Sequence, residues 1–314
     1  MEPKKGTLQP GETLLVDGPA SVRILSGEGY VFGARVAEGE RVVARDGKRI
    51  PINSASGRLE YEAKAAGGLA VVKGDAIPAS WKSAAELIVG AEGRVVVLGG
   101  VDSGKTGFCT YLANRAVPIL RKVGYVDGDV GQPEIGPPTA VTAAILDRQG
   151  YELPKLASCI RFVGSTSPSS CGERVVEAVG ECSAVLESTG AKMVIVNTDG
   201  WVREGGLFHK AELVSRLKAC KILSFLSQEE GEALRRRVGG TVEVVRLERP
   251  EHVRPRTQEE RRRNREASYR TYFRQAGRKR IGLGGIELAE AKFSGPVAQD
   301  PGGFSLEKGL LVGL

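Results

Sequence analysis

The residues with the most specific chemistry lie at Gly99–Thr106 and read Gly-Gly-Val-Asp-Ser-Gly-Lys-Thr, a complete G-x-x-x-x-G-K-[ST] phosphate loop. A predicted buried strand at 94–98 precedes the loop and a predicted helix follows it, so backbone N–H groups and the positive helix end point at phosphate. In such loops the lysine reaches the β- and γ-phosphates and the hydroxyl holds Mg²⁺, which assigns these roles to Lys105 and Thr106. A glycine-rich turn without a ligand is the alternative, but it does not account for the complete match. The residues expected to contact a nucleoside triphosphate are Gly100, Val101, Asp102, Ser103, Gly104, Lys105, Thr106 and Gly107.

A pair of carboxylates follows the next predicted strand, at 123–126, in the run Asp127-Gly-Asp129-Val-Gly-Gln132. In doubly wound sheets the carboxyl ends of the strands line the ligand crevice, so both carboxylates are expected beside the triphosphate and its metal. One can orient or deprotonate an attacking hydroxyl, and the other can steer Mg²⁺. The alternative is a turn rich in aspartate. The position one strand–helix unit after the phosphate loop favours the functional interpretation.

A tryptophan ends a third motif, Asn197-Thr-Asp-Gly-Trp201, which follows the apolar run 194–196. The motif is expected on the same rim of the sheet. A tryptophan in a glycine-containing loop can offer its ring for a base to stack on. A hydrophobic plug explains Trp201 equally well from the sequence alone.

An arginine-dense segment, 254–280, holds ten arginines, one lysine and three acidic residues. Charge runs of this kind are usually solvated helix faces. Here Arg261 and Arg265 are spaced i, i+4 and therefore project from one face of a helix. Two such guanidinium groups can close over a transferring phosphoryl group and offset its charge.

Composition restricts the class of protein. The chain has 314 residues and a net charge of +7, which predicts two or three domains and favours a polyanionic partner. The five cysteines show no metal-type spacing and there are only two histidines, which argues against a structural zinc site. No signal peptide and no apolar run of about 18 residues is evident, so we expect a soluble cytoplasmic protein that does not span a membrane.

The pattern of turns and apolar runs divides the chain into three parts. Residues 1–80 carry short apolar stretches between glycine-containing turns and predict an N-terminal all-β domain, a small sandwich or barrel. Residues 81–275 alternate strands and helices and predict an α/β P-loop domain with a mostly parallel, doubly wound sheet. A short C-terminal β-rich segment is expected at 276–314. Pro78–Trp81 is interpreted as the linker between the first two parts.

Five motifs occur in a fixed order along the chain: Gly99–Thr106, Asp127–Gln132, Gly164–Pro168, Thr198–Trp201, and Arg261-x-x-x-Arg265 followed by Tyr272-Phe273. Together they resemble the polynucleotide 5′-hydroxyl kinase family. This family includes the RNA kinase associated with tRNA splicing and mRNA 3′-end cleavage, and the pre-rRNA-processing kinases. In its short length, the chain most resembles an archaeal member of the family. In that family the last β-domain usually continues past the residues that match Gly309–Leu314.

The resemblance implies a role for each matched residue. Asp129 matches the general base, and Asp127 is its partner, expected with Thr106 at Mg²⁺. Lys105, Arg261 and Arg265 complete the catalytic set, the two arginines as a lid. The substrate-binding residues implied by the family are Asp129, Gln132, Thr198, Gly200 and Trp201, the last three in a clasp that stacks on the 5′ end of the substrate. Glu12 and Lys48 match more loosely residues near the adenine.

The family resemblance implies ATP- and Mg²⁺-dependent transfer of the γ-phosphate to the 5′-hydroxyl of RNA. It leaves DNA open as a second acceptor and RNA-processing proteins open as partners. The alternative is an ATP-binding scaffold for RNA processing that lacks kinase activity. A third class, a kinase of small molecules or nucleotides, fits poorly with the arginine-dense segment and the loop tryptophan.

Overall fold

The computed structural model describes residues 2–55, 57–154, 157–240 and 242–277, together with the backbone of two short paired strands, β17 (Gln299–Asp300) and β18 (Gly303–Phe304). The expected C-terminal segment 276–314 therefore lies mostly outside the described residues, and Gly309–Leu314 lies wholly outside them. None of the helices in the described ranges is long and apolar enough to cross a membrane.

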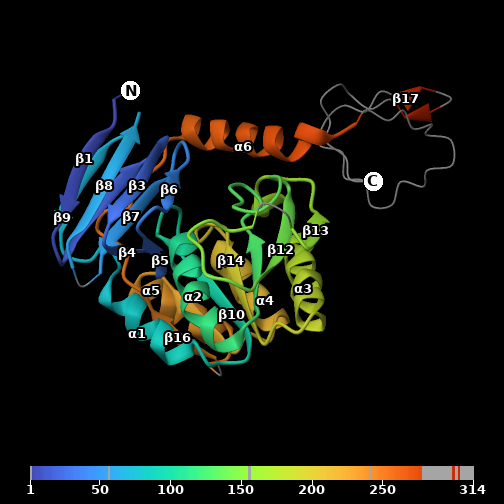
Figure 1. Cartoon of the computed structure of the whole chain (residues 1–314). Helices are drawn as coiled ribbons and strands as arrows, with labels where there is room; N and C mark the ends of the chain where they lie inside the picture. Colours follow the sequence, from blue (N-terminus) through green and yellow to red (C-terminus); the bar gives the residue numbers. More distant parts are fainter. Residues whose placement is uncertain are drawn as a thin grey trace.

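The N-terminal part is all-β, as predicted, and consists of two antiparallel sheets (Figure 1). Alternating residues of their strands point inward, as in the buried Leu59, Tyr61 and Ala63 of β8, and the inward residues of both sheets form one core. The first sheet has the order β1 (Lys4–Leu8), β8 (Leu59–Ala65), β3 (Ala20–Ser26), β6 (Arg41–Ala44). The second has the order β5 (Ala34–Ala37), β4 (Glu28–Val31), β7 (Arg49–Ser54), β2 (Glu12–Asp17), β9 (Leu69–Lys73).

A seven-stranded, mostly parallel sheet forms the centre of the rest, which confirms the predicted fold class. Its order is β13 (Cys159–Phe162), β12 (Ala140–Leu146), β11 (Val123–Gly128), β14 (Met193–Thr198), β10 (Gly93–Leu98), β15 (Lys221–Ser224), β16 (Glu243–Arg246). The five strands from β11 to β16 are parallel, whereas β12 and β13 pair antiparallel at one edge.

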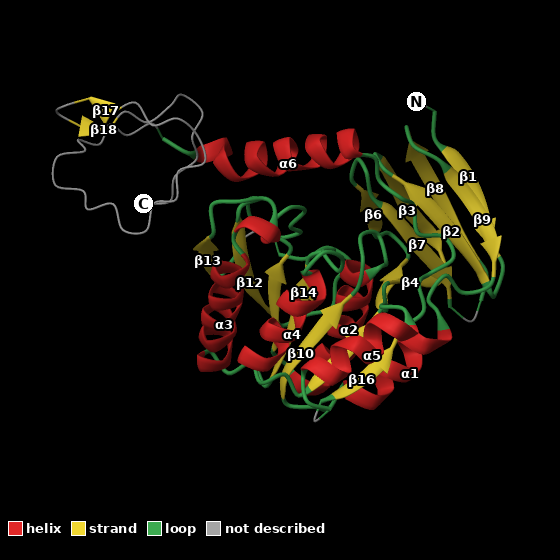
Figure 2. Ribbon diagram, turned by 180° about the vertical axis from the view of Figure 1, so that it is seen from behind, coloured by secondary structure: helices red, strands yellow, loops and turns green. Residues whose placement is uncertain are grey.

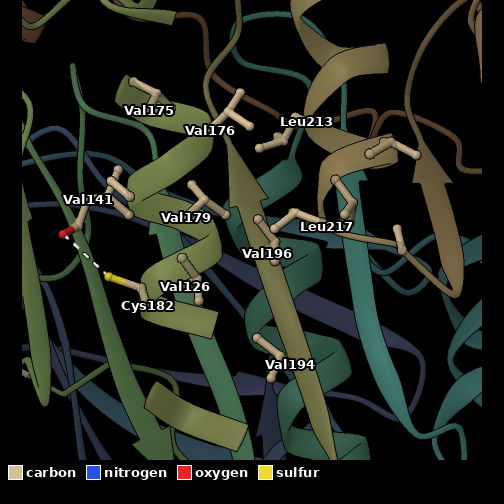
Figure 3. Close-up of a cluster of buried hydrophobic side chains, with 14 of the residues drawn as sticks. Val126, Val141, Val175, Val176, Val179, Cys182, Val194, Val196, Leu213 and Leu217 are labelled. Carbon is tan, nitrogen blue, oxygen red and sulfur yellow. Dashed lines mark hydrogen bonds between the residues drawn. The ribbon is translucent and has the colours of Figure 1, made fainter. Parts of the chain in front are cut away.

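Helices cover both faces of this sheet (Figure 2). On one face, α1 (Ala79–Ile88) and α2 (Lys105–Leu120) pack against one set of strand residues. On the other, α3 (Gly172–Ser188), α4 (Gly206–Arg216) and α5 (Gln228–Arg237) pack against the alternate set, and Figure 3 shows part of this cluster. Each fully buried valine or leucine in these layers contributes about 1.5–3 kcal/mol relative to an exposed position. The two layers fix the strand ends that carry the predicted motifs.

The predicted linker Pro78–Trp81 is wrong in its interpretation of Trp81. Trp81 lies in α1, is 1% exposed, and packs edge-on against Phe108 and Phe225 with ring centroids 5.3 and 6.0 Å apart. Its indole Nε1 donates a hydrogen bond to the Glu248 carbonyl oxygen at 3.0 Å. The tryptophan is therefore part of the core, and Pro78 marks the start of the helix rather than a flexible connection.

One helix stands apart from these layers. It is α6 (Gln258–Tyr272), which lies across the end of the seven-stranded sheet, next to the N-terminal sheets (Figures 1 and 2). Thr257 caps it and forms a reciprocal capping box with Glu260. Two short 3₁₀ turns, η1 (Pro168–Ser170) and η2 (Phe273–Gln275), complete the described elements.

Candidate active site

The phosphate loop has the predicted strand–turn–helix context, between β10 and α2. Gly104 adopts φ +104° immediately before α2, and a Cβ at this position would lie 3.0 Å from Pro250 Cδ, so only glycine fits there without strain. Lys105 is 7% exposed, and its Nζ donates to the carbonyl oxygens of Gly99 and Gly100 at 2.9 and 2.6 Å. Burial lowers the pKa of Lys105 to about 8, and nearby Asp129 opposes this shift. The loop thus places one cation and the first N–H groups of α2 at a single point.

Asp127 lies at the carboxyl end of β11 and is fully buried. Its Oδ2 accepts the N–H groups of Glu134 and Ile135 at 2.6 and 3.3 Å, and its Oδ1 accepts that of Asp129 at 3.4 Å. Burial raises the pKa of Asp127 to about 7, with a further contribution from the charge of Asp129. The carboxylate is thus rigidly oriented by backbone donors.

Asp129 is only half-buried and closes the turn that follows. Its Oδ1 accepts the N–H groups of Gly131 and Gln132 at 3.1 and 2.9 Å. Burial raises the pKa of the Asp129 carboxyl, and Asp199 adds to the rise while Lys105 opposes it. A carboxylate with a raised pKa beside a buried lysine has the character of a general base.

Asn197 joins the two oxygen atoms that the sequence assigns to Mg²⁺. It ends β14, is 1% exposed, and its Nδ2 donates to Thr106 Oγ1 at 3.5 Å and to Asp127 Oδ1 at 3.2 Å. Hydroxyl and carboxylate oxygens are the hard donors that Mg²⁺ prefers, and one or two protein ligands together with substrate phosphates usually suffice. Among the described residues, no three His, Cys, Asp or Glu side chains gather into a metal site. The donor set fits a magnesium ion held jointly with a nucleotide.

The predicted clasp motif is held by its own buried groups. Thr198 Oγ1 donates to the Val97 carbonyl oxygen at 2.8 Å, and Asp199 forms a buried ion pair with Lys210 at 2.5 Å. Asp199 Oδ1 also accepts the Trp201 N–H at 2.7 Å. A Cβ on Gly200 would lie 2.8 Å from Val101 N, so the glycine allows the clasp to touch the phosphate loop. These contacts fix the position of the Trp201 backbone, from which the ring projects.

The Trp201 ring is half-buried and stacks on His209, with ring centroids 5.5 Å apart and planes inclined by 29°. His209 itself is 5% exposed. The histidine therefore covers one face of the indole.

The burial of His209 should make the free energy of unfolding depend on pH in a specific way. Burial lowers the pKa of His209, Lys210 lowers it further, and Asp199 and Glu212 oppose the shift. The unfolded chain therefore binds more protons at this position, so stability present above about pH 6.5 is lost on acidification. Between about pH 7.5 and 5.5, we expect wild type to lose more free energy of unfolding than a His209→Phe variant, as measured by denaturant titration. Equal losses would contradict the assignment.

The arginine-dense segment supplies α6, whose half-buried face carries polar side chains at helical spacing: Arg261, Asn264, Arg265, Ser268 and Tyr269. Arg261 Nη2 donates to Asp102 Oδ2 at 2.6 Å, and Gln132 Nε2 donates to the Arg261 carbonyl oxygen at 3.0 Å. The predicted lid therefore contacts both the phosphate loop and the second motif.

One cavity lies between the N-terminal sheets, the phosphate loop and the lid. Its lining includes Lys48, Lys105, Asp129, Glu134, Gly200 and Arg261. Within the described ranges, Arg265 and Trp201 do not line it. Lys48 forms an ion pair with Glu134 across the two parts of the chain. Glu12 lines a second cavity beside Asn53, Asp75 and Tyr111, so the two loosely matched residues, Glu12 and Lys48, line different cavities.

A comparison with protein families decides the relationship. The family described as mRNA cleavage and polyadenylation factor CLP1 P-loop matches residues 99–275, from the phosphate loop to the end of the lid. The chain belongs to the CLP1 P-loop family. This confirms the resemblance inferred from the five motifs, all of which lie in the matched range.

Some curated relatives carry a kinase name, and others are named as CLP1 homologs. The chain is 33% identical over 189 residues to the polyribonucleotide 5′-hydroxyl-kinase of Pyrococcus furiosus, which covers 58% of this chain and 51% of the relative. It is 29% identical over 203 residues to the polyribonucleotide 5′-hydroxyl-kinase of Methanocaldococcus jannaschii. This match covers 63% of this chain and 55% of the relative. The chain spans about half the length of the curated relatives it matches.

A solved structure shows the fold of the CLP1 P-loop family over a larger part of the chain. Clp1p in its complex with Pcf11p superimposes with a TM-score of 0.68 at 18% identity, covering 87% of this chain and 73% of Clp1p. At this identity the match concerns the fold alone. Because 87% of the chain is more residues than 81–314 contains, the match extends from the P-loop part into the N-terminal sheets.

Several contacts of this CLP1-type site were not predicted from the sequence. Asn197 and the Asp199–Lys210 pair lie within or near a predicted motif, and the polar types on an otherwise apolar strand end were the only available signal. The ion pair between Asp102 and Arg256, with a nitrogen–oxygen distance of 3.1 Å, joins residues 154 positions apart and had no local signal.

Proposed function

We propose that this protein is an ATP- and Mg²⁺-dependent polynucleotide 5′-hydroxyl kinase that transfers the γ-phosphate of ATP to the 5′-hydroxyl end of RNA. The kinase name of the archaeal relatives supports the reaction class. A second structure of Pcf11p with Clp1p concerns the structural basis of ATP loss in a point mutant, which supports ATP as the nucleotide. We further propose the domain division 1–80, 81–275 and 276–314, with the reaction carried by the second domain.

The observation that carries the proposal is the convergence of Lys105, Asp129 and Arg261 on one cavity. Phosphoryl transfer needs little covalent help from a protein and depends on positioning and charge stabilisation. A cation at the phosphates, a carboxylate at the acceptor and an arginine above them supply these functions. A scaffold that only binds ATP would need the first of these groups and not the other two.

The proposed reaction is a direct displacement. The acceptor hydroxyl oxygen forms a bond to the γ-phosphorus while the bond between that phosphorus and the β,γ-bridging oxygen breaks, and ADP departs with the electron pair. Asp129 accepts the hydroxyl proton. Lys105 and Arg261 meet the charge that develops on the phosphoryl oxygens. A bound Mg²⁺, held by Thr106 and Asp127, would neutralise phosphate charge and orient the triphosphate.

The basic face of α6 and the clasp support a polynucleotide acceptor. Arg263 and Arg270 are exposed on α6, outside the cavity, where they can meet the phosphates of a bound strand. We propose that Trp201, Gly200 and Gln132 contact the 5′-terminal nucleotide. Thr198 contributes indirectly, because its hydroxyl is already bonded to the Val97 carbonyl oxygen.

Trp201→Ala should raise the KM for an oligonucleotide about 5- to 150-fold, the range expected when a base loses one stacking partner. The KM for ATP should change little, since Trp201 does not line the nucleotide cavity in the described part of the chain. Trp201→Phe is the matched control, because it keeps an aromatic face. Initial rates with varied ATP and varied oligonucleotide give both constants. If only the melting temperature falls, or if both KM values rise together, Trp201 is a structural plug.

The acceptor class is tested with ATP labelled in its γ-phosphate and a panel of 5′-hydroxyl acceptors: RNA, DNA and a free nucleoside. The proposal predicts label on the RNA 5′ end. Transfer to the free nucleoside with equal efficiency would instead favour a small-molecule kinase, and DNA labelling measures how far the acceptor range extends.

A further inference from the structure

The lid helix α6 is attached to the rest of the protein almost without apolar burial. None of its residues is buried, and its inward face presents the half-buried polar side chains named above. A helix of a globular protein is normally held by an apolar stripe against the core. The position of α6 must therefore depend on a few polar contacts.

Three such contacts join the segment 254–273 to the loops below it. Gln132 binds the Arg261 carbonyl oxygen at 3.0 Å, and Tyr269 Oη lies 3.4 Å from Thr139 Oγ1. The third contact is Asp102 with two arginines of the segment. Within the part of the chain that the structure describes, only this third contact joins opposite charges between the segment and the rest of the protein.

Asp102 accepts three hydrogen bonds from the segment. Its Oδ1 accepts Arg256 Nε at 3.1 Å, while its Oδ2 accepts the Arg256 backbone N–H at 2.9 Å and Arg261 Nη2 at 2.6 Å. The Asp102 side chain is only 8% exposed, so water screens these charges weakly. Hydrogen bonds between ionised partners are the strong ones.

The place of Asp102 in the chain gives this contact its meaning. Asp102 is in the middle of the phosphate loop, between Val101 and Ser103, with φ +52°, a conformation that aspartate and asparagine tolerate better than most residues. Arg261 Nε is also held, by the Arg256 carbonyl oxygen at 3.3 Å. Nε and Nη2 are engaged, whereas no hydrogen bond within the described ranges involves Nη1, so its two N–H groups can meet a phosphoryl oxygen.

We propose that Asp102 is a positioning residue that anchors the lid to the phosphate loop and aims the Arg261 guanidinium at the transferring phosphoryl group. The inference rests on the proposed kinase function. It adds that the phosphate loop contributes more than backbone N–H groups and Lys105, because its aspartate orders an arginine supplied from 159 residues away. The lid position and the loop conformation are thereby coupled.

The test compares wild type with Asp102→Asn, which keeps the side-chain volume and the tolerance for positive φ but removes the charge. Asp147→Asn is the matched control, because Asp147 is an exposed aspartate outside the cavity. Hydrogen exchange of 254–273 and steady-state kinetics on a 5′-hydroxyl RNA oligonucleotide are both measured. In Asp102→Asn, we expect the backbone amides of α6 to exchange at least about tenfold faster than in wild type. We expect kcat to fall about 10- to 150-fold, with a small change in the KM for ATP.

A double variant separates positioning from a direct role at the nucleotide. Asp102→Asn combined with Arg261→Ala should be no slower than Arg261→Ala alone, because the anchor has no effect without its arginine. Wild-type exchange in Asp102→Asn, or an additive loss in the double variant, would overturn the inference. If wild type itself transfers no phosphate, the proposed function fails instead, and the exchange measurement still decides whether Asp102 anchors the lid.

Discussion

Arg261→Ala is expected to lower kcat for phosphoryl transfer by about 10³–10⁵, the range seen when an arginine that meets a transferring phosphoryl group is removed. Arg261 lines the cavity above the phosphate loop, and its guanidinium is already ordered by Asp102. A group that meets charge mainly in the transition state acts on kcat, so the KM for ATP should rise much less.

The neighbouring Arg262→Ala is the control for this prediction. Arg262 is 76% exposed and forms an ion pair with Glu266 on the outer face of the same helix. Its removal should leave kcat near that of wild type. Near-normal kinetics of Arg261→Ala, measured with saturating oligonucleotide, would remove the lid interpretation. We expect a smaller loss for Arg265→Ala, because Arg265 shares the half-buried face but does not line the cavity among the described residues.

Asp129→Asn should lower the transfer rate by about 10²–10⁴ while ATP binding stays close to that of wild type. The amide oxygen of asparagine can still accept the N–H groups of Gly131 and Gln132, so the turn should keep its shape. The amide cannot accept the proton of the attacking hydroxyl. Single-turnover transfer and equilibrium ATP binding, measured on the same preparation, separate the two effects.

Asp127→Asn is the informative partner variant. Because Asp127 is proposed to hold Mg²⁺, its replacement should raise the Mg²⁺ concentration needed for activity. Because Asp127 is fully buried and accepts three backbone N–H groups, its replacement should also reduce stability. If Asp127→Asn abolishes transfer at saturating Mg²⁺ while Asp129→Asn remains active, the roles of the two carboxylates are the reverse of those proposed.

The sequence predicted those parts of the fold and of the site whose signals are local. The apolar runs 94–98 and 194–196 are each followed immediately by a polar motif, and the structure places both motifs at the carboxyl ends of the neighbouring parallel strands β10 and β14. The strands β12 and β13 were missed, because no helix separates β11 from β12 or β12 from β13, and these strands pair antiparallel rather than in a strand–helix unit. Trp81 was misread because a proline such as Pro78 signals the start of a helix as well as a linker.

The other features that the sequence could not predict are contacts between residues far apart in the chain. Asn197 joins Thr106 and Asp127, which lie 91 and 70 positions away, and Asp102 meets Arg261 at a separation of 159. Spacing patterns report neighbours on one helix or strand and carry no information on such pairs. The two cavities likewise arise where the N-terminal sheets approach the P-loop part. The sequence therefore could not predict that Lys48 and Glu12 line different cavities.

The central claim is transfer of a phosphoryl group to a polynucleotide 5′ end, and it is tested most directly by following the γ-phosphate label of ATP onto a 5′-hydroxyl RNA oligonucleotide in the presence of Mg²⁺. Wild type, Asp129→Asn and Asp147→Asn are compared under single-turnover conditions, and nuclease digestion locates the label. The account predicts label on the 5′-terminal nucleotide with wild type and Asp147→Asn, and a loss of about 10²–10⁴ in rate with Asp129→Asn. Tight ATP binding by wild type without any labelled RNA would contradict it and would favour an ATP-binding scaffold.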